Sequence, residues 1–297
     1  MTPQPQRSRR APIGVFDSGL GGLTVVREMR RRLPDEQIIY VGDTANAPYG
    51  ARSEEEIRAL SRGMARYLLD EFSCRGLVIA CNTATAAAAE AVRAAVAPTP
   101  VVAMEPAVKP AAAATRTGKV GVLATVGTLA SARFAALLER HRGDGRVEFL
   151  TQPCPGFVEA VEQNRIDAPE TRALAESYIR PLLERGADTL VLGCTHYPAM
   201  RALIAAVAGP GVVLIDTGEA VARRAADLFA AIAPSDAPAA RGRGGLRLFT
   251  TGDPDAFGRG ARVILGERFA GPDALRWRAD GTLHAVPSAP AALAPAA

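Results

Sequence analysis

The chain has 297 residues, enough for about two domains, and its 48% hydrophobic and 22% charged residues are ordinary for a globular protein. No apolar run reaches the length of a membrane span, so we expect no association with a membrane. The net charge is +4, but three of these charges come from Arg7, Arg9 and Arg10, so we expect no nucleic-acid partner. Four cysteines in a chain that does not open with a signal peptide predict reduced thiols and a cytoplasmic protein.

Residues 1–10 are polar and basic, and we expect them to form a disordered leader. A strand is predicted at 12–16, a glycine-rich turn at 17–22 and a helix at 23–33. The glycines do not form a dinucleotide-binding fingerprint, because the third glycine of that pattern would fall at Thr24. The turn brings Asp17 and Ser18 to the edge of a sheet, without deciding whether they bind a ligand.

A second strand is predicted at 37–42, and the loop that follows it, 43–50, is rich in turn-forming residues and contains Tyr49 and Gly50. Loops at the carboxyl end of a strand often bind ligands, although an ordinary surface loop would have the same composition. Ser53 and Glu56 form a capping box, which predicts the start of a helix that continues to Phe72.

Two apolar runs, 76–80 and 189–193, each end in a cysteine followed by small polar residues. Cys81 is followed by Asn82 and Thr83, and Cys194 by Thr195 and His196. Each run is long enough for a strand buried on both faces, and each is followed by a segment compatible with a helix. The carboxyl ends of such strands are where α/β proteins bind ligands, so each junction brings one thiol to a candidate site.

The sequence also predicts an internal duplication. Residues 119–125 resemble residues 12–18, which places Thr125 opposite Ser18 at an offset of 107 positions. The two cysteine junctions are 113 positions apart. Two offsets this similar indicate that one strand–helix–strand unit occurs twice.

The remaining elements complete an α/β pattern, which we interpret as two pseudo-symmetric, doubly wound domains with mostly parallel sheets and the site in the cleft between them. The first domain is predicted at 11–104 and 216–285, the second at 105–215, and a disordered tail at 286–297. The other predicted elements are helices at 85–96, 129–140, 158–163, 169–185 and 253–265, a helix ending at Phe229, strands at 101–103, 147–152, 212–215 and 246–250, and a loop at 231–245.

Two opposed thiols can act on a carbon atom from both sides. If each cysteine lies at the start of a helix, the backbone N–H groups and the helix dipole should lower its pKa and make it a general base. One thiolate could then remove a proton from one face while the other thiol returns a proton to the opposite face. This chemistry inverts a stereocentre without a cofactor or a metal.

Other readings of the same residues stay open. A single buried cysteine is more often a packing residue, and we assign that role to Cys74 and Cys154. A zinc site could use both junction cysteines with His196, although no close ligand pair such as C-x-x-C is present. A Cys–His hydrolase would leave one of the two cysteines without a role. A non-catalytic binding protein would need neither thiol.

The set of motifs resembles the glutamate racemases, within the superfamily of cofactor-independent Asp/Glu racemases. The motifs that carry the resemblance are Val15–Gly22, Gly42–Thr44, Pro48–Gly50, Cys81–Thr83 and Gly193–Pro198. The resemblance implies two α/β domains, no cofactor, and interconversion of L- and D-glutamate that supplies D-glutamate for peptidoglycan. Aspartate racemases are the nearest alternative, and they usually have Glu where this chain has His196. We also expect a homodimer.

The resemblance also implies roles for individual residues. Cys81 would be the base for D-glutamate, assisted by Asp17, and Cys194 the base for L-glutamate, assisted by His196 and by the acidic helper Glu162. The predicted substrate-binding residues are Asp17, Ser18, Tyr49, Gly50, Asn82, Thr83, Thr125, Thr128, Thr195 and His196.

Overall fold

The structure is a computed structural model that describes residues 11–142, 145–231 and 244–286. The predicted leader, most of the loop at 231–245 and the tail from residue 287 lie outside these residues. In the described part, the strands form one seven-stranded sheet, in the order β11-β10-β9-β2-β1-β3-β4, and one four-stranded sheet, in the order β6-β5-β7-β8. Within this part every strand pair is parallel except β10 with β11.

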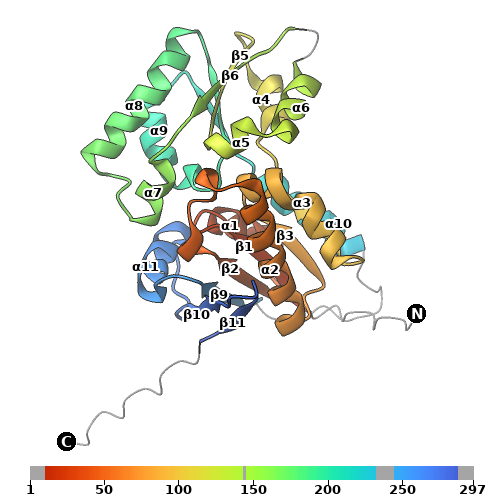
Figure 1. Ribbon diagram of the computed structural model, residues 1–297. Helices are drawn as coiled ribbons and strands as arrows, with labels where there is room; N and C mark the ends of the chain where they lie inside the picture. Colours follow the sequence, from red (N-terminus) through yellow and green to blue (C-terminus); the bar gives the residue numbers. More distant parts are fainter. Residues whose placement is uncertain (1–10, 143–144, 232–243, 287–297) are drawn as a thin grey trace, which may run out of the picture.

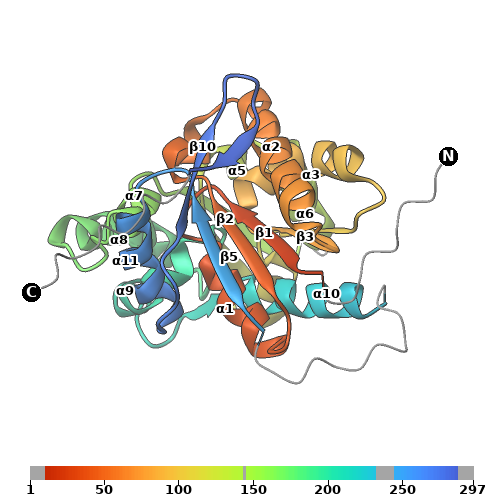
Figure 2. The ribbon, with the colours of Figure 1, turned by 90° about the horizontal axis from the view of Figure 1, so that it is seen from below.

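The larger sheet is covered by helices on both faces (Figure 2). Helices α1 (Leu23–Arg32), α10 (Gly218–Ala231) and α11 (Pro254–Leu265) lie on one face, and α2 (Glu54–Phe72) and α3 (Asn82–Val96) lie on the other. The central strands are buried throughout, as expected for a parallel sheet between two helical layers. The strands are β1 (Ile13–Asp17), β2 (Ile38–Gly42), β3 (Gly76–Ile79), β4 (Val101–Ala103), β9 (Leu246–Thr250), β10 (Asp273–Trp277) and β11 (Leu283–Ala285).

The smaller sheet has the same layered construction (Figure 1). Helices α4 (Val108–Ala114) and α6 (Ala132–His141) lie on one face, and α8 (Pro169–Glu184) and α9 (Arg201–Ala208) lie on the other. Its strands are β5 (Lys119–Ala124), β6 (Glu148–Pro153), β7 (Thr189–Leu192) and β8 (Val213–Ile215). Short helices follow several strands: α5 (Val126–Ala130), α7 (Phe157–Glu162), η1 (Thr44–Asn46), η2 (Tyr49–Ala51) and η3 (Tyr197–Met200).

The predicted duplication is present in the topology. Strands β2-β1-β3-β4 of the larger sheet correspond in order to β6-β5-β7-β8 of the smaller one. The registers also match, because Gly14 pairs with Leu77 and Gly121 pairs with Leu190. These pairs are related by the two offsets found in the sequence, so the repeated unit is a parallel sheet of four strands.

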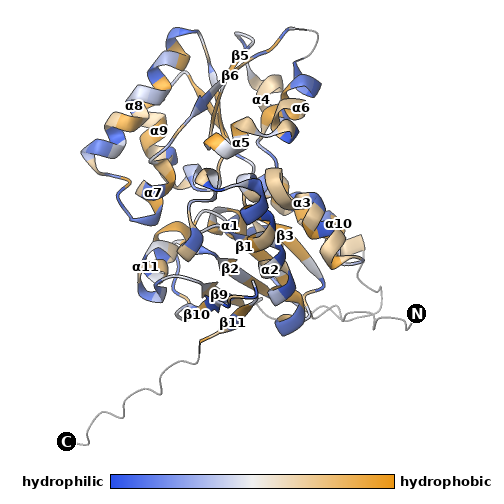
Figure 3. Cartoon of the chain, in the orientation of Figure 1, coloured by the Kyte–Doolittle hydropathy of each residue, from blue (hydrophilic) through white to orange (hydrophobic). Residues whose placement is uncertain are grey.

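The two sheets direct the carboxyl ends of their strands toward each other (Figure 1). The segment after β1 meets the loop after β7 there: Thr24, at the start of α1, donates a hydrogen bond of 3.0 Å to the carbonyl of Thr195, and a Cβ at Gly21 would overlap the ring of His196. Colouring by hydropathy shows apolar strands inside each half and polar residues on many outward helix faces (Figure 3). The site predicted between the halves is therefore at the junction of two separate sheets.

Some predicted elements were wrong in detail. The helix expected at 129–140 is two helices, α5 and α6, because Ser131 has an extended backbone and its hydroxyl caps α6 by accepting from Phe134 N. Helix α4 and the hairpin of β10 and β11 were not predicted. The capping box was correct: Ser53 Oγ accepts from Glu56 N at 3.3 Å, and Glu56 Oε2 accepts from Ser53 N at 2.9 Å.

Candidate active site

The first thiol lies where β3 leads into α3. Cys81 is the N-cap of α3, which begins at Asn82 rather than at Thr85 as predicted. Its Sγ accepts a hydrogen bond from Ala84 N at 3.3 Å and donates to Ser18 Oγ at 3.8 Å. The predicted position of this thiol at a helix start is confirmed.

The expected effect of that position on acidity is not found. Burial raises the pKa of Cys81 well above its ordinary value, and the nearby carboxylate of Asp17 raises it further. The hydrogen bond from Ala84 N acts in the opposite direction but does not prevail. Cys81 is therefore a neutral thiol near neutral pH in this arrangement, poised to give a proton rather than to take one.

The second thiol is placed differently. Cys194 lies two residues beyond β7, and the prediction that it begins a helix was wrong. The chain first makes a turn, in which Tyr197 N donates to Cys194 O at 3.1 Å, then continues through η3 before α9 begins at Arg201. The partner of this sulfur is instead a ring nitrogen, because Cys194 Sγ lies 3.7 Å from His196 Nδ1.

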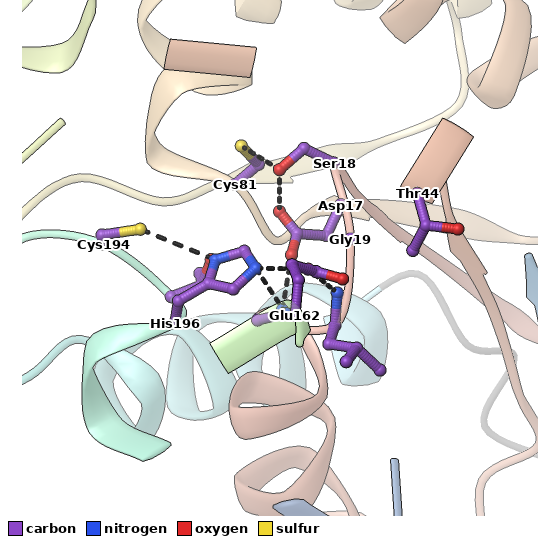
Figure 4. A network of polar contacts seen from close by, with 12 residues as sticks. Asp17, Ser18, Gly19, Thr44, Cys81, Glu162, Cys194 and His196 are labelled. Atoms are coloured by element: carbon purple, nitrogen blue, oxygen red, sulfur yellow. Dashed lines mark hydrogen bonds and ion pairs between the residues drawn. The ribbon is translucent and has the colours of Figure 1, made fainter. Parts of the chain in front are cut away.

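His196 connects Cys194 to the carboxylate of Glu162, at the end of α7 (Figure 4). Its Nε2 lies 2.6 Å from Glu162 Oε1, on α7. Burial alone would favour the neutral ring, but the contacts with Cys194 and Glu162 prevail and raise the pKa of His196 well above its ordinary value. The ring is therefore positively charged near neutral pH, with its charge next to Cys194 Sγ.

Asp17, the predicted helper of Cys81, is linked to that thiol through Ser18. Asp17 is fully buried, and its carboxylate accepts from Gly22 N at 2.6 Å and from Ser18 Oγ at 3.4 Å. Ser18 in turn accepts the hydrogen bond from Cys81, so the serine hydroxyl lies between carboxylate and thiol (Figure 4). Burial raises the pKa of Asp17, while the charged His196 ring and backbone N–H groups partly offset that effect.

Three threonine hydroxyls meet across the boundary between the halves. Thr83 Oγ1, from the first turn of α3, lies 2.9 Å from Thr125 Oγ1 and 3.3 Å from Thr128 Oγ1. Thr125, the N-cap of α5, also donates to Thr128 at 2.9 Å. The hydroxyls and the two helix N-termini form a neutral, donor-rich surface that suits a carboxylate.

A small cleft joins these groups, with a free volume of about 10 Å³. Of the predicted site residues, ten line it, whereas Asp17, Thr128 and Glu162 do not. Sequence reasoning missed Val158, for which the sequence has no signal, and Pro48, which belongs to the Pro48–Gly50 motif. The lining residues are Ser18, Pro48, Tyr49, Gly50, Cys81, Asn82, Thr83, Thr125, Val158, Cys194, Thr195 and His196.

Two lining residues differ in how their polar groups are satisfied. The side-chain amide of Asn82 is 3% exposed, and neither its Nδ2 nor its Oδ1 has a hydrogen-bond partner among the described residues. Buried amides without partners are rare, so this one is available to a ligand. The hydroxyl of Tyr49 instead points away to Asp43, to which it donates at 2.6 Å.

Residues 11–142, 145–231 and 244–286 contain neither a candidate metal centre nor a candidate membrane span. No three His, Cys, Asp or Glu side chains in these ranges are placed to hold a metal ion. No helix in the same ranges is long and apolar enough to cross a membrane.

The chain is similar to known proteins over most of its length. The sequence model of the Asp/Glu/hydantoin racemase family matches residues 13–225. A glutamate racemase of Stutzerimonas stutzeri is 48% identical over 260 residues, covering 86% of this chain and 95% of that protein. Among solved structures, a glutamate racemase of Bacillus anthracis is 35% identical with a TM-score of 0.77, covering 88% of this chain and 96% of that one. A glutamate racemase of Francisella tularensis, solved in complex with D-glutamate, is 29% identical with a TM-score of 0.76, covering 90% and 97%.

The repeated parallel sheet and the similarity to racemases define an α/β enzyme of the isomerase class, and the chain belongs to the Asp/Glu/hydantoin racemase family. Within that family, the curated relative and the two structures described above are glutamate racemases.

Proposed function

We propose that this chain racemises glutamate by a two-thiol mechanism without a cofactor. The observation that carries the proposal is that Cys81 and Cys194, from equivalent junctions of two repeated sheets, line the same cleft. A thiol on each side of one carbon is what inversion by proton exchange requires. Similarity to glutamate racemases, rather than the cleft itself, supports glutamate as the substrate.

The protonation states support one direction of a first turnover. Cys194 lies beside a positively charged His196, so its sulfur is suited to take the Cα proton of L-glutamate. Cys81 is a neutral thiol and is suited to deliver its proton to the opposite face of Cα, giving D-glutamate. Cys194 is then a thiol and Cys81 a thiolate, which is the state needed for the reverse reaction. Glu162 holds the His196 ring toward Cys194. Ser18, hydrogen-bonded to both Asp17 and Cys81, links the Asp17 carboxylate to the Cys81 thiol.

Neutral donors around the cleft would bind the two carboxylates, and hydroxyl and amide oxygens would accept from the amino group. We assign the hydroxyls of Thr83 and Thr125 to one carboxylate, and the unpartnered amide of Asn82 to the polar groups at Cα. The other proposed contacts come from Ser18, Tyr49, Gly50, Thr195 and His196. The similar racemase of Francisella tularensis was solved with D-glutamate bound, which supports a substrate of this size and charge.

The free volume of about 10 Å³ has room for about one water molecule, so glutamate does not fit. We propose that the two halves separate to admit the substrate and close again around it, which would also exclude water from the proton transfers. The moving bodies would be the domains 11–104 with 216–285 and 105–215, in line with the strands that each sheet contains. The supply of D-glutamate for peptidoglycan, the cytoplasmic location and the homodimer stay predictions from the sequence.

Optical rotation tests the proposed function. Purified protein should bring a solution of L-glutamate to zero rotation, and a solution of D-glutamate to the same end point, without added cofactor. L-Aspartate should keep its rotation over the same period. A stable rotation with glutamate would refute the proposal, and faster loss with aspartate would assign the chain to the other substrate of the family.

A further inference from the structure

Asp43, a buried carboxylate outside the cleft, accepts hydrogen bonds from four different side chains. Asp43 is 0% exposed, and its Oδ1 accepts from Asn46 Nδ2 at 3.0 Å, Thr251 Oγ1 at 2.7 Å and Trp277 Nε1 at 2.8 Å. Its Oδ2 accepts from Tyr49 OH at 2.6 Å. In the part of the chain that the structure describes, no arginine or lysine forms an ion pair with it. We call these five residues the Asp43 cluster.

A buried carboxylate without a cation is costly, and neutral donors compensate only when all of them are held in place. An amide of the same shape could not replace it, because its NH₂ group would face donors rather than acceptors. The cluster therefore has one arrangement that satisfies it. The four side chains that donate to Asp43 are therefore fixed in position relative to one another.

One member of the cluster, Tyr49, also lines the cleft. Tyr49 is 1% exposed and lies between Pro48 and Gly50, and all three residues line the cleft. Its hydroxyl donates to Asp43, so the hydroxyl proton is not available to a ligand in the cleft. Gly50 packs closely on the other half, since a Cβ there would lie 3.0 Å from Thr125 Cβ. The Asp43–Tyr49 hydrogen bond thus sets where this segment meets the second half.

Two other members come from the far end of the chain and do not line the cleft. Thr251, in the turn after β9, donates to Asp43 and accepts from Ala45 N at 3.0 Å. Trp277 is on β10, next to the edge of the sheet, and its ring fills the space where Gly63 of α2 lacks a side chain. The C-terminal strands therefore brace the loop at 43–50 from outside the site.

We propose that Asp43 is a positioning residue, which with Thr251 and Trp277 fixes Tyr49 and Gly50 for binding of the substrate's non-reacting groups. The inference rests on the proposed function and deepens it. Among the described residues, the hydrogen bonds of the two thiols involve no member of the cluster, so its loss should weaken binding of both enantiomers without altering proton transfer. Of the C-terminal hairpin, Trp277 is thereby the residue that supports substrate binding.

The first test uses Trp277→Phe and Thr251→Val, which each remove one donor to Asp43 and keep most of the packing. We expect KM for L- and D-glutamate to rise about threefold to tenfold, the range for the net contribution of one ordinary hydrogen bond. The isotope effect at Cα should stay unchanged. Arg276→Ala, an exposed neighbour on β10, is the matched control and should leave KM unchanged. Unchanged KM in both cluster variants, or a lower kcat at constant KM from loss of folded enzyme, would overturn the proposal.

The second test asks whether the effect travels through Tyr49. Tyr49→Phe should raise KM by itself, and Trp277→Phe should add little in that background, because the contact it supports is already gone. Full additivity of the two changes would overturn the proposed route. Tyr67→Phe, on α2, is the control for loss of a phenol hydroxyl and should leave KM unchanged.

A binding readout separates this proposal from the proposed function. Trp277 is the one tryptophan of the chain, so intrinsic fluorescence reports on the cluster directly. Glutamate should change the emission of the wild type, and Thr251→Val should shift that response to higher glutamate concentration. Turnover with unaltered KM in the variants would refute the positioning role alone. Glutamate binding without turnover would refute the function and keep the positioning role, and neither binding nor turnover would refute both.

Discussion

Glu162, on α7 of the second half, accepts a hydrogen bond of 2.6 Å from the backbone N–H of Leu20 in the first half. The same oxygen, Oε1, lies 2.6 Å from His196 Nε2. One carboxylate oxygen thus contacts both the turn after β1 and the histidine beside Cys194, and the first of these contacts crosses the boundary between the halves. Separation of the halves would break the contact with Leu20, so the proposed closing motion and the orientation of His196 are coupled through Glu162.

Glu162→Gln removes the negative charge but keeps the size of the side chain. The pKa of His196 should fall, because one of the groups that raises it is lost. The His196 ring should then lose its positive charge at a lower pH. As the pH rises, kcat/KM of the variant should therefore begin to decline at a lower pH than kcat/KM of the wild type. We also expect kcat/KM at neutral pH to fall about tenfold to a hundredfold, which is less than for loss of a general acid or base itself because Glu162 acts through His196. Glu170→Gln, at an exposed position of α8, is the control, and identical pH profiles for Glu162→Gln and wild type would contradict this assignment.

Replacing either cleft thiol should abolish racemisation. Cys81→Ala and Cys194→Ala should each fall below about a thousandth of the wild-type rate, since each removes one of the two proton carriers. Circular dichroism should show an intact fold for both variants. Cys74→Ala and Cys154→Ala should stay active, because neither sulfur lines the cleft, although both are buried and their loss should lower the thermal midpoint. An active Cys81→Ala or Cys194→Ala enzyme would rule out the two-thiol mechanism.

Isotope effects should separate the two sides of the site. L- and D-glutamate are mirror images, so kcat/KM must be equal in both directions for every variant. His196→Asn should raise the barrier at Cys194 relative to that at Cys81, which would enlarge the isotope effect for Cα-deuterated L-glutamate and reduce it for D-glutamate. Asp17→Asn, acting through Ser18, should produce the opposite pair of changes. Isotope effects that move together in both directions would refute the pairing of His196 with Cys194.

Asp188 should make stability depend on pH. Burial by itself raises the pKa of this carboxyl, but hydrogen bonds from Thr115 Oγ1 and from the N–H groups of Arg116 and Thr117 prevail and lower it from 3.8 to about 2. Because the folded-state pKa is the lower one, its contribution of about 2 kcal/mol is complete above the unfolded value and is lost as the pH falls toward the folded one. Asp188→Asn should lower the free energy of unfolding in urea at pH 7 by about this amount, with a smaller difference near the folded-state pKa. Asp167→Asn, at an exposed position, is the control; equal losses for both variants would show that the hydrogen bonds at Asp188 contribute nothing specific.

Patterns along the chain were sufficient to predict the α/β fold, the duplication and the two thiol junctions. Buried parallel strands leave continuous apolar runs, and a repeated unit leaves repeated spacing, so Cys81 and Cys194 could be located without coordinates. The capping box at Ser53 was equally readable, because its hydrogen bonds join residues three positions apart. These features were predicted correctly, whereas the helix start expected at Cys194 and the unbroken helix expected at 129–140 were not.

The protonation of the site residues and the contacts that hold the cleft-lining segments in place depend on the tertiary structure. The pKa of Cys81 is raised by burial, which overrides the helix start that the sequence predicts, and burial is set by packing of both halves. Ser18 stands between Asp17 and Cys81, and Val158 lines the cleft, only because of how distant loops meet. Asp43 and Trp277 are 234 positions apart, and no local pattern indicates their hydrogen bond. The sequence by itself determined which groups reach the site, whereas the tertiary structure decided their protonation and their support, because both depend on contacts between residues far apart in the chain.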